Sequence, residues 1–565
     1  MPRPSCRLNG GQILFECLVR EGVQVIFGIT GGSIMPIYHE MTGYPSIRHV
    51  TVRHEQAAAH AADGYARATR RVGVCMATSG PGATNLVTGI ATAHLDSVPM
   101  VAITGQVSVP VLGTDFFQEV DITGICMPIT KHSYLVTDVR DLGQAVREAF
   151  HIASTGRPGP VLIDIPKDVQ LAQCEFDLEA LYAQPLDLPG YKPHLAGNAR
   201  QIRQAAEMIG QSQRPVIVAG RGVLIAQAQG ELRALVEKAQ IPVVTSLLGK
   251  SVLPETHPLC LGMGGMHGEA YANNALQTAD LVIGIGSRFD DRLTSSADTF
   301  APKAKIIHID VDPAEIGKRV RVDLPIVGDA RNVLVQLVPL VAPTTHPEWY
   351  EQIEAWRSDS AARDILWREG DELVPQYVIR QVWEATEGRA LMVSDVGQNQ
   401  MWEAQYYRHE VPGGLITSGG LGTMGYSLPA AMGVAIGRPE MPVWVVAGDG
   451  GFQMNSQELM TIVQEHLPIK IVILNNGYLG MVRQWQEMFY QKNYSGSPIL
   501  GPDFARLAEA YGVPGFTVTD KSQVVEAVQR AMATEGPVLI DFRIEREHNV
   551  FPIVPVGQPI DHMIR

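Results

Sequence analysis

Short apolar runs alternate with amphipathic segments along the first part of the chain. Apolar runs bounded by glycine or proline are typical of buried strands, and apolar residues at helical spacing are typical of helices that cover a sheet. Strands and helices in alternation indicate a parallel sheet with helices on its faces. The predicted helices are Gly11–Arg20 and His54–Arg67, and the predicted strands are Val25–Ile29, Val72–Thr78, Val98–Gly105 and Val161–Ile165.

Two proline-containing stretches interrupt this alternation, as linkers between domains do. Residues 171–198 lose their periodicity and contain Pro185, Pro189 and Pro193, and a second break falls at residues 343–347. A chain of 565 residues is long enough for about three to four domains. We therefore predict an α/β protein with three doubly wound parallel-sheet domains, at residues 1–185, 199–342 and 365–565. The strands expected in the middle domain include Pro215–Ala219, Val243–Ser246, Leu281–Ile285 and Ile306–Val311.

A glycine-rich turn in the third domain is the first candidate for chemistry. The predicted strand Pro442–Ala447 runs into Gly448-Asp449-Gly450-Gly451, and the strand Ile469–Leu474 ends in Asn475-Asn476. Because ligands collect at the carboxyl ends of the strands in a doubly wound sheet, Asp449 and Asn476 are expected side by side. Carboxylate and amide oxygens suit Mg²⁺ held together with a diphosphate. No Gly-Lys-Ser/Thr follows the glycines, so the turn is not a nucleotide P-loop.

A helix is expected after this turn, with Leu459 and Ile462 at helical spacing behind a Ser456 cap. The first domain contains a related stretch, in which the strand Val72–Thr78 runs into Ser79-Gly80-Pro81-Gly82 and Asn85 follows. We interpret the two stretches as two copies of one α/β unit. Taken alone, the Gly-Asp-Gly turn would be better explained as a hairpin turn.

Glu55 opens the alanine-rich helix of the first domain. Its neighbours Ala57, Ala58 and Ala59 are small, so we expect a tight, apolar site in which the carboxyl group hydrogen-bonds a cofactor ring. The alternative is a first-turn glutamate favoured by the helix dipole. In the third domain, Gly419–Gly425 is expected to be a close-approach loop, and Met424 within it is either a wedge against a cofactor or an ordinary core methionine.

Composition and charge exclude several classes of protein. The net charge of −14 argues against a nucleic-acid binder. No apolar run is long enough to span a bilayer, and the first residues lack the apolar core of a signal peptide. The six cysteines are scattered and form no Cys-x-x-Cys pair, which favours reduced thiols and a cytoplasmic location.

Together these stretches resemble the large catalytic subunit of acetohydroxyacid synthase (acetolactate synthase), a thiamin diphosphate enzyme family, from about residue 9 to the C-terminus. The glycine-rich and glutamate segments are shared by many thiamin enzymes. The stretches Gly286-Ser-Arg-Phe-Asp-Asp-Arg292 and Gly480-Met-Val-Arg-Gln-Trp-Gln486 are particular to this family. The other matching stretches are residues 27–32, 53–60, 78–85, 157–168 and 418–425.

The resemblance implies a role for each matching residue. Asp449, Asn476 and the carbonyl of Tyr478 would hold Mg²⁺, and Arg292 and Trp485 would receive the second keto acid. Glu55 would bind the pyrimidine ring of thiamin diphosphate. The remaining catalytic positions would be Gly32, Phe117, Gln118 and Lys167, and the remaining thiamin diphosphate positions would be Pro81, Asn85, Val396, Gly397, Gln398, Gly422, Met424, Gly448, Gly450, Gly451 and Met481.

Members of the family also bind FAD across the middle domain. The sequence Gly284-Ile285-Gly286 is one glycine short of a dinucleotide fingerprint, so FAD is implied by the resemblance and not by that motif. The family usually has Pro at Thr30 and His at Asn399, and Asn399 can still donate a hydrogen bond to a diphosphate. The matching FAD positions are Arg157, Gly220, Gly222, Met266, His267, Gly286, Arg288, Asp290, Asp310 and Asp329.

The activity that the resemblance implies is condensation of two pyruvates to 2-acetolactate, or of pyruvate with 2-ketobutyrate, at the first common step of branched-chain amino acid biosynthesis. The alternatives are another thiamin diphosphate carboligase, a decarboxylase or a pyruvate oxidase, or a binding protein that kept the fold and lost catalysis. The presence of Glu55, Asp449 and Asn476 argues against the last. The implied partners are small 2-keto acids, a second copy of the chain in a homodimer or homotetramer with active sites between chains, and a possible small regulatory subunit.

Overall fold

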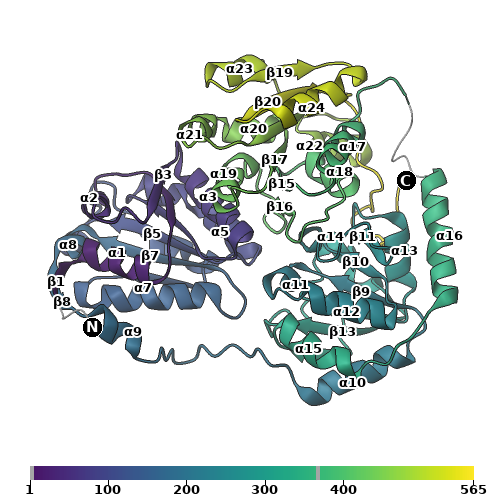
Figure 1. The fold of residues 1–565 in the computed structure, drawn as a ribbon, viewed down its shortest axis with the longest axis horizontal. Coiled ribbons are helices and arrows are strands. Elements are labelled where there is room, and N and C mark those ends of the chain that lie inside the picture. Colours follow the sequence, from purple (N-terminus) through teal and green to yellow (C-terminus); the bar gives the residue numbers. More distant parts are fainter. Residues whose placement is uncertain (1–5, 364–369) are drawn as a thin grey trace.

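Three six-stranded sheets with helices on both faces make up the computed structural model, which describes residues 6–363 and 370–565 (Figure 1). Within these sheets the paired strands run parallel. The predicted fold class of three doubly wound parallel-sheet domains is therefore confirmed. A small antiparallel sheet joins β1 (Cys6–Asn9) to β8 (Gln173–Phe176).

The first sheet has the strand order β3-β2-β4-β5-β7-β6. Its first helix begins with a capping box, in which the Asn9 side chain accepts the Gln12 N–H and the Gln12 side chain accepts the Asn9 N–H. The strands are β2 (Val25–Gly28), β3 (Arg48–Thr51), β4 (Gly73–Ala77), β5 (Met100–Gln106), β6 (His132–Leu135) and β7 (Pro160–Pro166), and the helices include α1 (Gly10–Arg20), α3 (Glu55–Thr69), α4 (Pro81–Asn85), α5 (Val87–Leu95), α7 (Val139–Ser154) and α8 (Lys167–Leu171).

The third sheet, with the order β16-β15-β17-β18-β20-β19, repeats the connectivity of the first strand for strand. This agreement confirms the two copies of one α/β unit that the sequence indicated. The strands are β15 (Leu391–Ser394), β16 (Leu415–Thr417), β17 (Val443–Gly448), β18 (Lys470–Asn475), β19 (Gly515–Val518) and β20 (Val538–Arg543), and the helices are α17 (Pro375–Thr386), α18 (Gln398–Tyr406), α19 (Ser427–Gly437), α20 (Asp449–Met454), α21 (Leu459–Gln464), α22 (Gly480–Phe489), α23 (Phe504–Ala510) and α24 (Val524–Ala533).

The middle sheet has a different order, β11-β10-β9-β12-β13-β14. This is the strand order of dinucleotide-binding folds. The strands are β9 (Pro215–Ala219), β10 (Val243–Thr245), β11 (Cys260–Met263), β12 (Leu281–Ile285), β13 (Lys305–Asp310) and β14 (Leu324–Val327), and the helices are α10 (Ala199–Gln211), α11 (Arg221–Ile225), α12 (Gln229–Ala239), α13 (Ala270–Thr278), α14 (Asp291–Thr294), α15 (Ala330–Leu340) and α16 (Pro347–Arg363).

Each sheet has a switch point, where successive connections leave the sheet in opposite directions. It lies between β2 and β4 in the first sheet, between β9 and β12 in the middle sheet, and between β15 and β17 in the third. Ligands of doubly wound sheets bind at such switch points, beyond the carboxyl ends of the strands. The turns that follow these six strands are therefore the expected binding edges of the three domains.

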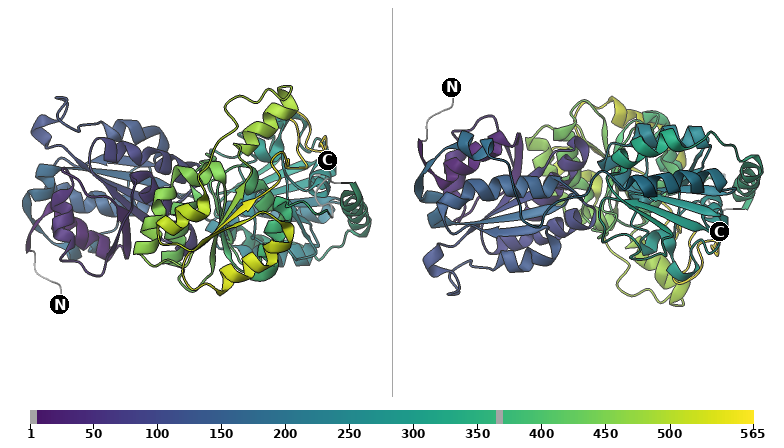
Figure 2. Two further views of the ribbon diagram at one scale, coloured as in Figure 1. Left: turned by 90° about the horizontal axis from the view of Figure 1, so that it is seen from above. Right: turned by 90° about the horizontal axis from the view of Figure 1, so that it is seen from below.

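The first and third domains pack through helices α3 and α19, and the chain reaches the middle domain by an extended segment after α9 (Leu178–Ala183), along the bottom of Figure 1. Two glycines allow the close approach of the helices. A Cβ on Gly64 would lie 2.1 Å from the carbonyl oxygen of Ala430, and a Cβ on Gly433 would lie 1.8 Å from that of Ala61. Both views of Figure 2 show the first domain at one end of the molecule. The packing fixes α3, and with it Glu55, against the third domain.

Two features of the third domain differ from the predicted elements. Helix α20 begins at Asp449, so no loop separates β17 from the next helix, which was expected to begin only after Ser456. The predicted Ser456 cap is wrong, since Ser456 begins a separate 3-10 turn and its side chain makes no capping hydrogen bond.

Helix α16 is absent from the predicted elements and begins at Pro347, the last residue of the second predicted linker. Its Trp349 is buried, donates its indole N–H to the carbonyl of Pro215 at 3.2 Å and meets Trp356 edge to face. All strands of the three sheets lie within residues 25–166, 215–327 and 391–543. The domain ends at 185, 199 and 342 stay predictions, and those at 1 and 365 lie outside the described residues. None of the helices in those residues combines the length and the apolar character that a membrane span requires.

Candidate functional site

Glu55 lies at the switch point of the first sheet. It is the first residue of α3, half-buried, and its Oε2 accepts a hydrogen bond from Nδ2 of Asn85 at 2.9 Å. Gly82 makes room for this pair, because a Cβ there would lie 2.8 Å from Thr78 and 3.4 Å from Oε1 of Glu55. Glu55 was expected in a tight apolar site, but within a single chain it is partly exposed to solvent.

The other candidate residues of the first domain surround this edge. Gln118 has a left-handed φ of 61° and folds over Gly80, next to Pro81. Phe117 beside it is 81% exposed. Gly32 is exposed in open space, and Lys167 begins α8 at the end of β7. The structure brings these residues to one face of the first domain.

Asp449 has an electrostatic environment suited to a cation. It follows β17 directly and is 1% exposed, and its Oδ2 has no hydrogen-bond partner. Burial raises the pKa of the Asp449 carboxyl to about 6, although backbone N–H groups of Asp449, Asn476 and Gly477 act in the opposite direction. A buried acceptor without a partner costs free energy that a bound cation would recover. The residues at this edge therefore fit Mg²⁺.

Asn476 is held beside Asp449 by its own neighbours. Its Oδ1 accepts the N–H of Tyr478 at 3.1 Å, and its Nδ2 lies 3.3 Å from Oε1 of Gln398. Gln398 in turn donates to Gln484 of α22. The predicted Mg²⁺ ligands and Gln398 thus belong to one hydrogen-bonded group.

Asn399 was expected to be able to donate a hydrogen bond to a diphosphate. Its amide N–H groups instead donate to the carbonyls of Asp395 and Val446, which corrects that expectation.

The glycine loop at residues 418–425 is fixed to the same switch point. Gly422 and Gly425 have left-handed φ angles of 71° and 83°. The buried Asp395, which follows β15, accepts N–H bonds from Gly425 and Ser427, both at 2.9 Å. Met424 lies 3.6 Å from where a Cβ on Gly450 would be, which is van der Waals distance, so the loop packs next to the turn that follows β17.

A cavity of about 660 Å³ joins this loop to the middle domain. It receives Val396, Gly397 and Met424 from one side and Gly222, Gly286 and Arg288 from the other. The remaining predicted cofactor residues that line it are Gly422, Met481, Arg157, Met266, His267, Asp290, Asp310 and Asp329.

On the middle-domain side of the cavity, the turns after β9 and β12 cross at the switch point. We call the contact of Gly220 and Gly222 with Gly286 the glycine crossing. Gly222 donates its N–H to the carbonyl of Gly286 at 3.0 Å, and a Cβ on Gly222 would lie 2.5 Å from Cα of Gly286. Gly220 donates to the carbonyl of Ile285 and also abuts Gly286. The dinucleotide fingerprint that the sequence lacks is thus replaced by glycines from two separate turns. Any side chain at these glycines would fill the space at the switch point. Such a glycine-lined switch point fits a dinucleotide such as FAD.

Burial shifts the pKa values of two residues that line the cavity. It lowers the pKa of His267 to about 4 and raises the pKa of Asp310 to about 6. Arg157 donates to Asp312 at 3.1 Å and to Glu315 at 2.7 Å, which ties the first domain to the middle domain. At neutral pH, His267 therefore presents a neutral ring to the cavity.

Arg292 and Trp485 both line this cavity, although they come from different domains. Arg292 follows the middle switch point and extends its guanidinium toward Sδ of Met266. Trp485 lies on α22 and packs edge to face on Phe489. The lining of the cavity therefore includes a cation and an aromatic ring as well as Met424.

The residues of the first-domain face are absent from the lining of this cavity. None of Glu55, Gly32, Phe117, Gln118 and Lys167 lies among its walls in the part of the chain that the structure describes. Sequence reasoning also missed Asp395 and Asp96, two buried carboxylates that fix the glycine loop. The position of Asp395 at the carboxyl end of an apolar run was an available signal.

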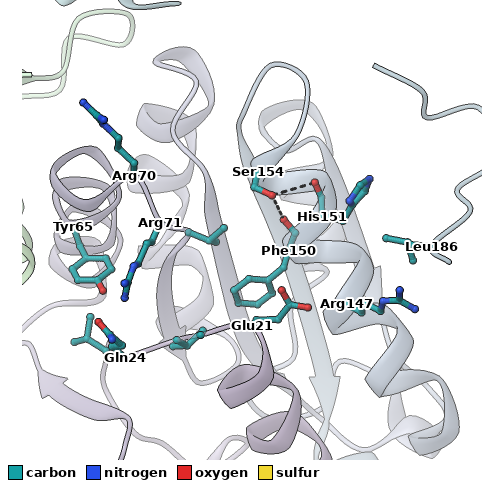
Figure 3. Close-up of a pocket in the computed structure, with 14 residues that line it drawn as sticks. Glu21, Gln24, Tyr65, Arg70, Arg71, Arg147, Phe150, His151, Ser154 and Leu186 are labelled. Atoms are coloured by element: carbon teal, nitrogen blue, oxygen red, sulfur yellow. Dashed lines mark hydrogen bonds between the residues drawn. The ribbon is translucent and has the colours of Figure 1, made fainter. Parts of the chain in front are cut away.

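A second cavity, of about 610 Å³, lies at the opposite edge of the first sheet, where β2 and β4 begin (Figure 3). Two of its charged residues already have partners: Arg147 donates to the carbonyls of Leu181 and Gln184, and Glu21 accepts from Tyr182. It contains none of the predicted site residues.

The chain matches three family models in sequence order. Residues 8–125 match the N-terminal TPP binding domain of thiamine pyrophosphate enzymes, residues 202–337 match their central domain, and residues 395–542 match their C-terminal TPP binding domain. Thiamine pyrophosphate is thiamin diphosphate, so the matched models agree with the cofactor expected at the two switch points.

Curated relatives are similar over almost their whole lengths. The acetolactate synthase large subunit of Corynebacterium glutamicum is 50% identical, over 98% of this chain and 89% of that protein. The acetolactate synthase of Mycobacterium bovis is 47% identical, over 99% of this chain and 91% of that protein. The acetolactate synthase large subunit of Pyropia yezoensis is 46% identical, over 100% of this chain and 96% of that protein. The chain thus belongs to the thiamine pyrophosphate enzymes and, among them, to the acetolactate synthase large subunits.

Proposed function

We propose that this chain is the catalytic subunit of an acetolactate synthase. It decarboxylates pyruvate and joins the remaining two-carbon unit to a second pyruvate, giving 2-acetolactate, or to 2-ketobutyrate, giving 2-aceto-2-hydroxybutyrate. The observation that carries the proposal is the cavity whose lining combines Arg292, Trp485 and the glycine loop of the proposed thiamin diphosphate site. This lining supports a binding site for an acceptor acid close to the cofactor.

The diphosphate end of the cofactor belongs to the third domain. Asp449, Asn476 and the carbonyl of Tyr478 would hold Mg²⁺, and the partnerless Oδ2 of Asp449 supports that role. Gly397, Gly448 and Gly450 would let the backbone approach the diphosphate. When bound, thiamin diphosphate supplies the electron sink for decarboxylation.

The acceptor acid would bind through Arg292 and Trp485. A guanidinium grips a carboxylate through two parallel hydrogen bonds, which an ammonium group cannot reproduce. The indole ring would pack on the alkyl tail, where 2-ketobutyrate has one methylene more than pyruvate. Such a group is worth about 1–3 kcal/mol in an apolar pocket, so Trp485 would set the preference between the two acceptors.

FAD would occupy the middle-domain side of the cavity. The glycine crossing at Gly222 and Gly286 would take its diphosphate, and Arg288, Asp290 and Asp310 line the same space. The net reaction transfers no electrons, so the flavin would serve to complete the fold around the cavity.

A second copy of the chain would complete the site. Glu55, Phe117 and Lys167 line none of the 660 Å³ cavity, and the 81% exposure of Phe117 leaves an aromatic ring uncovered. An active site between two chains would place one protomer's Glu55 over its partner's glycine loop. Because the relatives are named large subunits, the proposal includes a small regulatory partner.

The test is a product assay on the purified chain supplied with thiamin diphosphate, Mg²⁺ and FAD. Pyruvate alone should give acetolactate, detected as acetoin after acid treatment, and added 2-ketobutyrate should divert the product to 2-aceto-2-hydroxybutyrate. Stoichiometric reduction of the flavin on each turnover would instead identify a pyruvate oxidase, and acetaldehyde as the main product would identify a simple decarboxylase.

A further inference from the structure

The glycine loop of the third domain is held in shape by side chains of the first domain. Asp96, which caps the end of α5 and is 2% exposed, accepts the N–H of Gly419 at 3.0 Å and the N–H of Gly420 at 2.7 Å. A Cβ on Gly420 would lie 2.8 Å from Oδ1 of Asp96, so the contact itself requires glycine. Two consecutive N–H groups on one buried carboxylate fix the direction in which the loop leaves β16.

Thr92, one turn earlier on the same helix, holds the other end of the loop. Its hydroxyl lies 2.8 Å from the hydroxyl of Thr423, and it donates its own hydrogen to the carbonyl of Thr88. The Thr423 hydroxyl is therefore the donor to Thr92. Thr423 immediately precedes Met424, the residue that reaches toward Gly450. Helix α5 thus grips the loop on both sides of Leu421 and Gly422, which line the cavity.

Arg67 of α3 secures Asp96 and the start of the loop. It donates to Asp96 at 2.7 Å, to Asp63 at 2.6 Å and to the carbonyl of Thr417 at 3.0 Å. Although burial disfavours its charge, the pKa of Arg67 lies well above its ordinary value because Asp63, Tyr426 and Asp96 surround it. Arg221 of the middle domain donates to the backbone carbonyl of Asp96. Asp96 is therefore in contact with all three domains.

We infer that Asp96, with Thr92, is a positioning residue for thiamin diphosphate: the first domain sets the shape of the loop that the third domain offers to the cofactor. The inference rests on the proposed function, in which residues 418–424 line the thiamin diphosphate site. The assignment concerns binding of the cofactor and not the bond-making step, because Asp96 reaches the cofactor only through the backbone of the loop.

The experiment compares Asp96→Asn with Asp63→Asn in the full chain carrying FAD and Mg²⁺. Both aspartates are buried and pair with Arg67. Among the described residues, Asp63 accepts the hydroxyl of Tyr426, which follows the loop, but it accepts no backbone N–H from the loop itself. The dissociation constant of thiamin diphosphate, read from tryptophan fluorescence, should rise roughly 10- to 100-fold in Asp96→Asn, the worth of hydrogen bonds to a charged acceptor. It should change far less in Asp63→Asn, while the two variants lose similar thermal stability.

A milder pair keeps the test valid if Asp96→Asn fails to fold. Thr92→Val removes the hydroxyl that accepts from Thr423 and should raise the same dissociation constant about three- to tenfold, as loss of a neutral hydrogen bond does. Thr92→Ser keeps the hydroxyl and should restore the affinity.

Equal weakening of cofactor binding in Asp63→Asn and Asp96→Asn would overturn the inference, because the ion pairs would then merely hold the domains together. An unchanged dissociation constant in a folded Asp96→Asn or Thr92→Val variant would also overturn it. A wild-type chain that binds thiamin diphosphate but makes no acetolactate would contradict the proposed function. The dissociation constants of the variants could still be compared in that case.

Discussion

Single residues act at this site only where the surrounding backbone presents them. Glu55 reaches Asn85 because Gly82 leaves space between them. Asp449 keeps a free carboxylate oxygen because α20 begins at that residue and encloses it. In each case a small residue or a helix start decides which atoms a charged side chain can offer to a ligand.

Replacing Glu55 tests the carboxylate assigned to the pyrimidine ring. Glu55→Gln should bind thiamin diphosphate but lose roughly 10²–10⁴-fold in turnover, the usual worth of a positioned acid–base group. The measurements are steady-state acetolactate formation and cofactor content after gel filtration. Turnover close to that of the wild type would return Glu55 to a structural role at the helix start.

Replacing Trp485 tests the choice of acceptor. Trp485→Leu should still form acetolactate from pyruvate but lose most of a preference of roughly tens-fold for 2-ketobutyrate. Arg292→Lys is the matched comparison, since it should weaken capture of both acceptors. The measurement is the ratio of the two products at fixed concentrations of both keto acids, and an unchanged ratio in Trp485→Leu would remove this residue from the acceptor site.

Asp164 on β7 gives a pH-dependent contribution to stability. Burial raises its pKa to about 7 from 3.8, against hydrogen bonds from Thr104 and Gln106. Between those pH values the folded chain keeps a proton that the unfolded chain has released, so this group lowers the free energy of unfolding as the pH rises toward 7. Asp164→Asn cannot titrate. Relative to the wild type, its stability should therefore improve by about 2 kcal/mol between pH 5 and pH 8. Urea unfolding of both proteins at the two pH values checks this, and a constant difference would refute it.

At the scale of elements, the turns after paired strands form the candidate site. The switch points between β2 and β4, β9 and β12, and β15 and β17 carry residues predicted to bind cofactors. The glycines at these turns let two backbones meet where side chains would collide. The middle domain shows this most clearly, because its glycines come from the separate turns after β9 and β12.

A glycine-to-alanine pair tests that crossing. Gly222→Ala places a Cβ 2.5 Å from Cα of Gly286 and should expel FAD from the purified chain. Gly230→Ala, at a position with nothing within 4 Å, should leave flavin content unchanged. Bound-flavin absorbance after gel filtration is the measurement. Full flavin content in Gly222→Ala would place FAD elsewhere.

At the scale of the whole molecule, the three domains divide the site between them. The third domain offers the diphosphate edge, the middle domain the glycine crossing, and the first domain both Glu55 and the grip of Asp96 on the loop. The face that carries Glu55 and Phe117 does not line the main cavity. The site is therefore proposed to require two chains.

Mixing two inactive variants tests this arrangement. Glu55→Gln lacks the pyrimidine carboxylate and Asp449→Ala lacks the metal ligand, and Asp449→Ala should lose Mg²⁺ and thiamin diphosphate together. If sites form between chains, a mixed dimer contains one site with both residues intact, so activity should partly return after subunit exchange. Failure to recover activity, with exchange demonstrated by differently tagged chains, would favour a site within one chain.

Most elements, and the chemistry of single turns, follow from the local sequence. Apolar runs at Pro215–Ala219 and Leu281–Ile285 became β9 and β12 with the same bounds, because burial on both faces of a parallel sheet selects such runs directly. The Asp449 turn was readable because strand, glycines and carboxylate are contiguous. Helix α16 could not be predicted, because its sequence is not strongly amphipathic. The helix is held instead by packing on α13 and by the hydrogen bond from Trp349 to Pro215.

Which distant residues come together depends on how the elements pack. Gly222 and Gly286 cross, Arg292 and Trp485 line one cavity, and Asp96 accepts hydrogen bonds from Gly419 and Gly420, more than 300 residues away in the sequence. Such contacts depend on sheet order and on the packing of α3 against α19, which local propensity does not encode. The physical reason is that a strand or helix forms from its own residues, whereas a site forms from the spaces that packed elements leave between them.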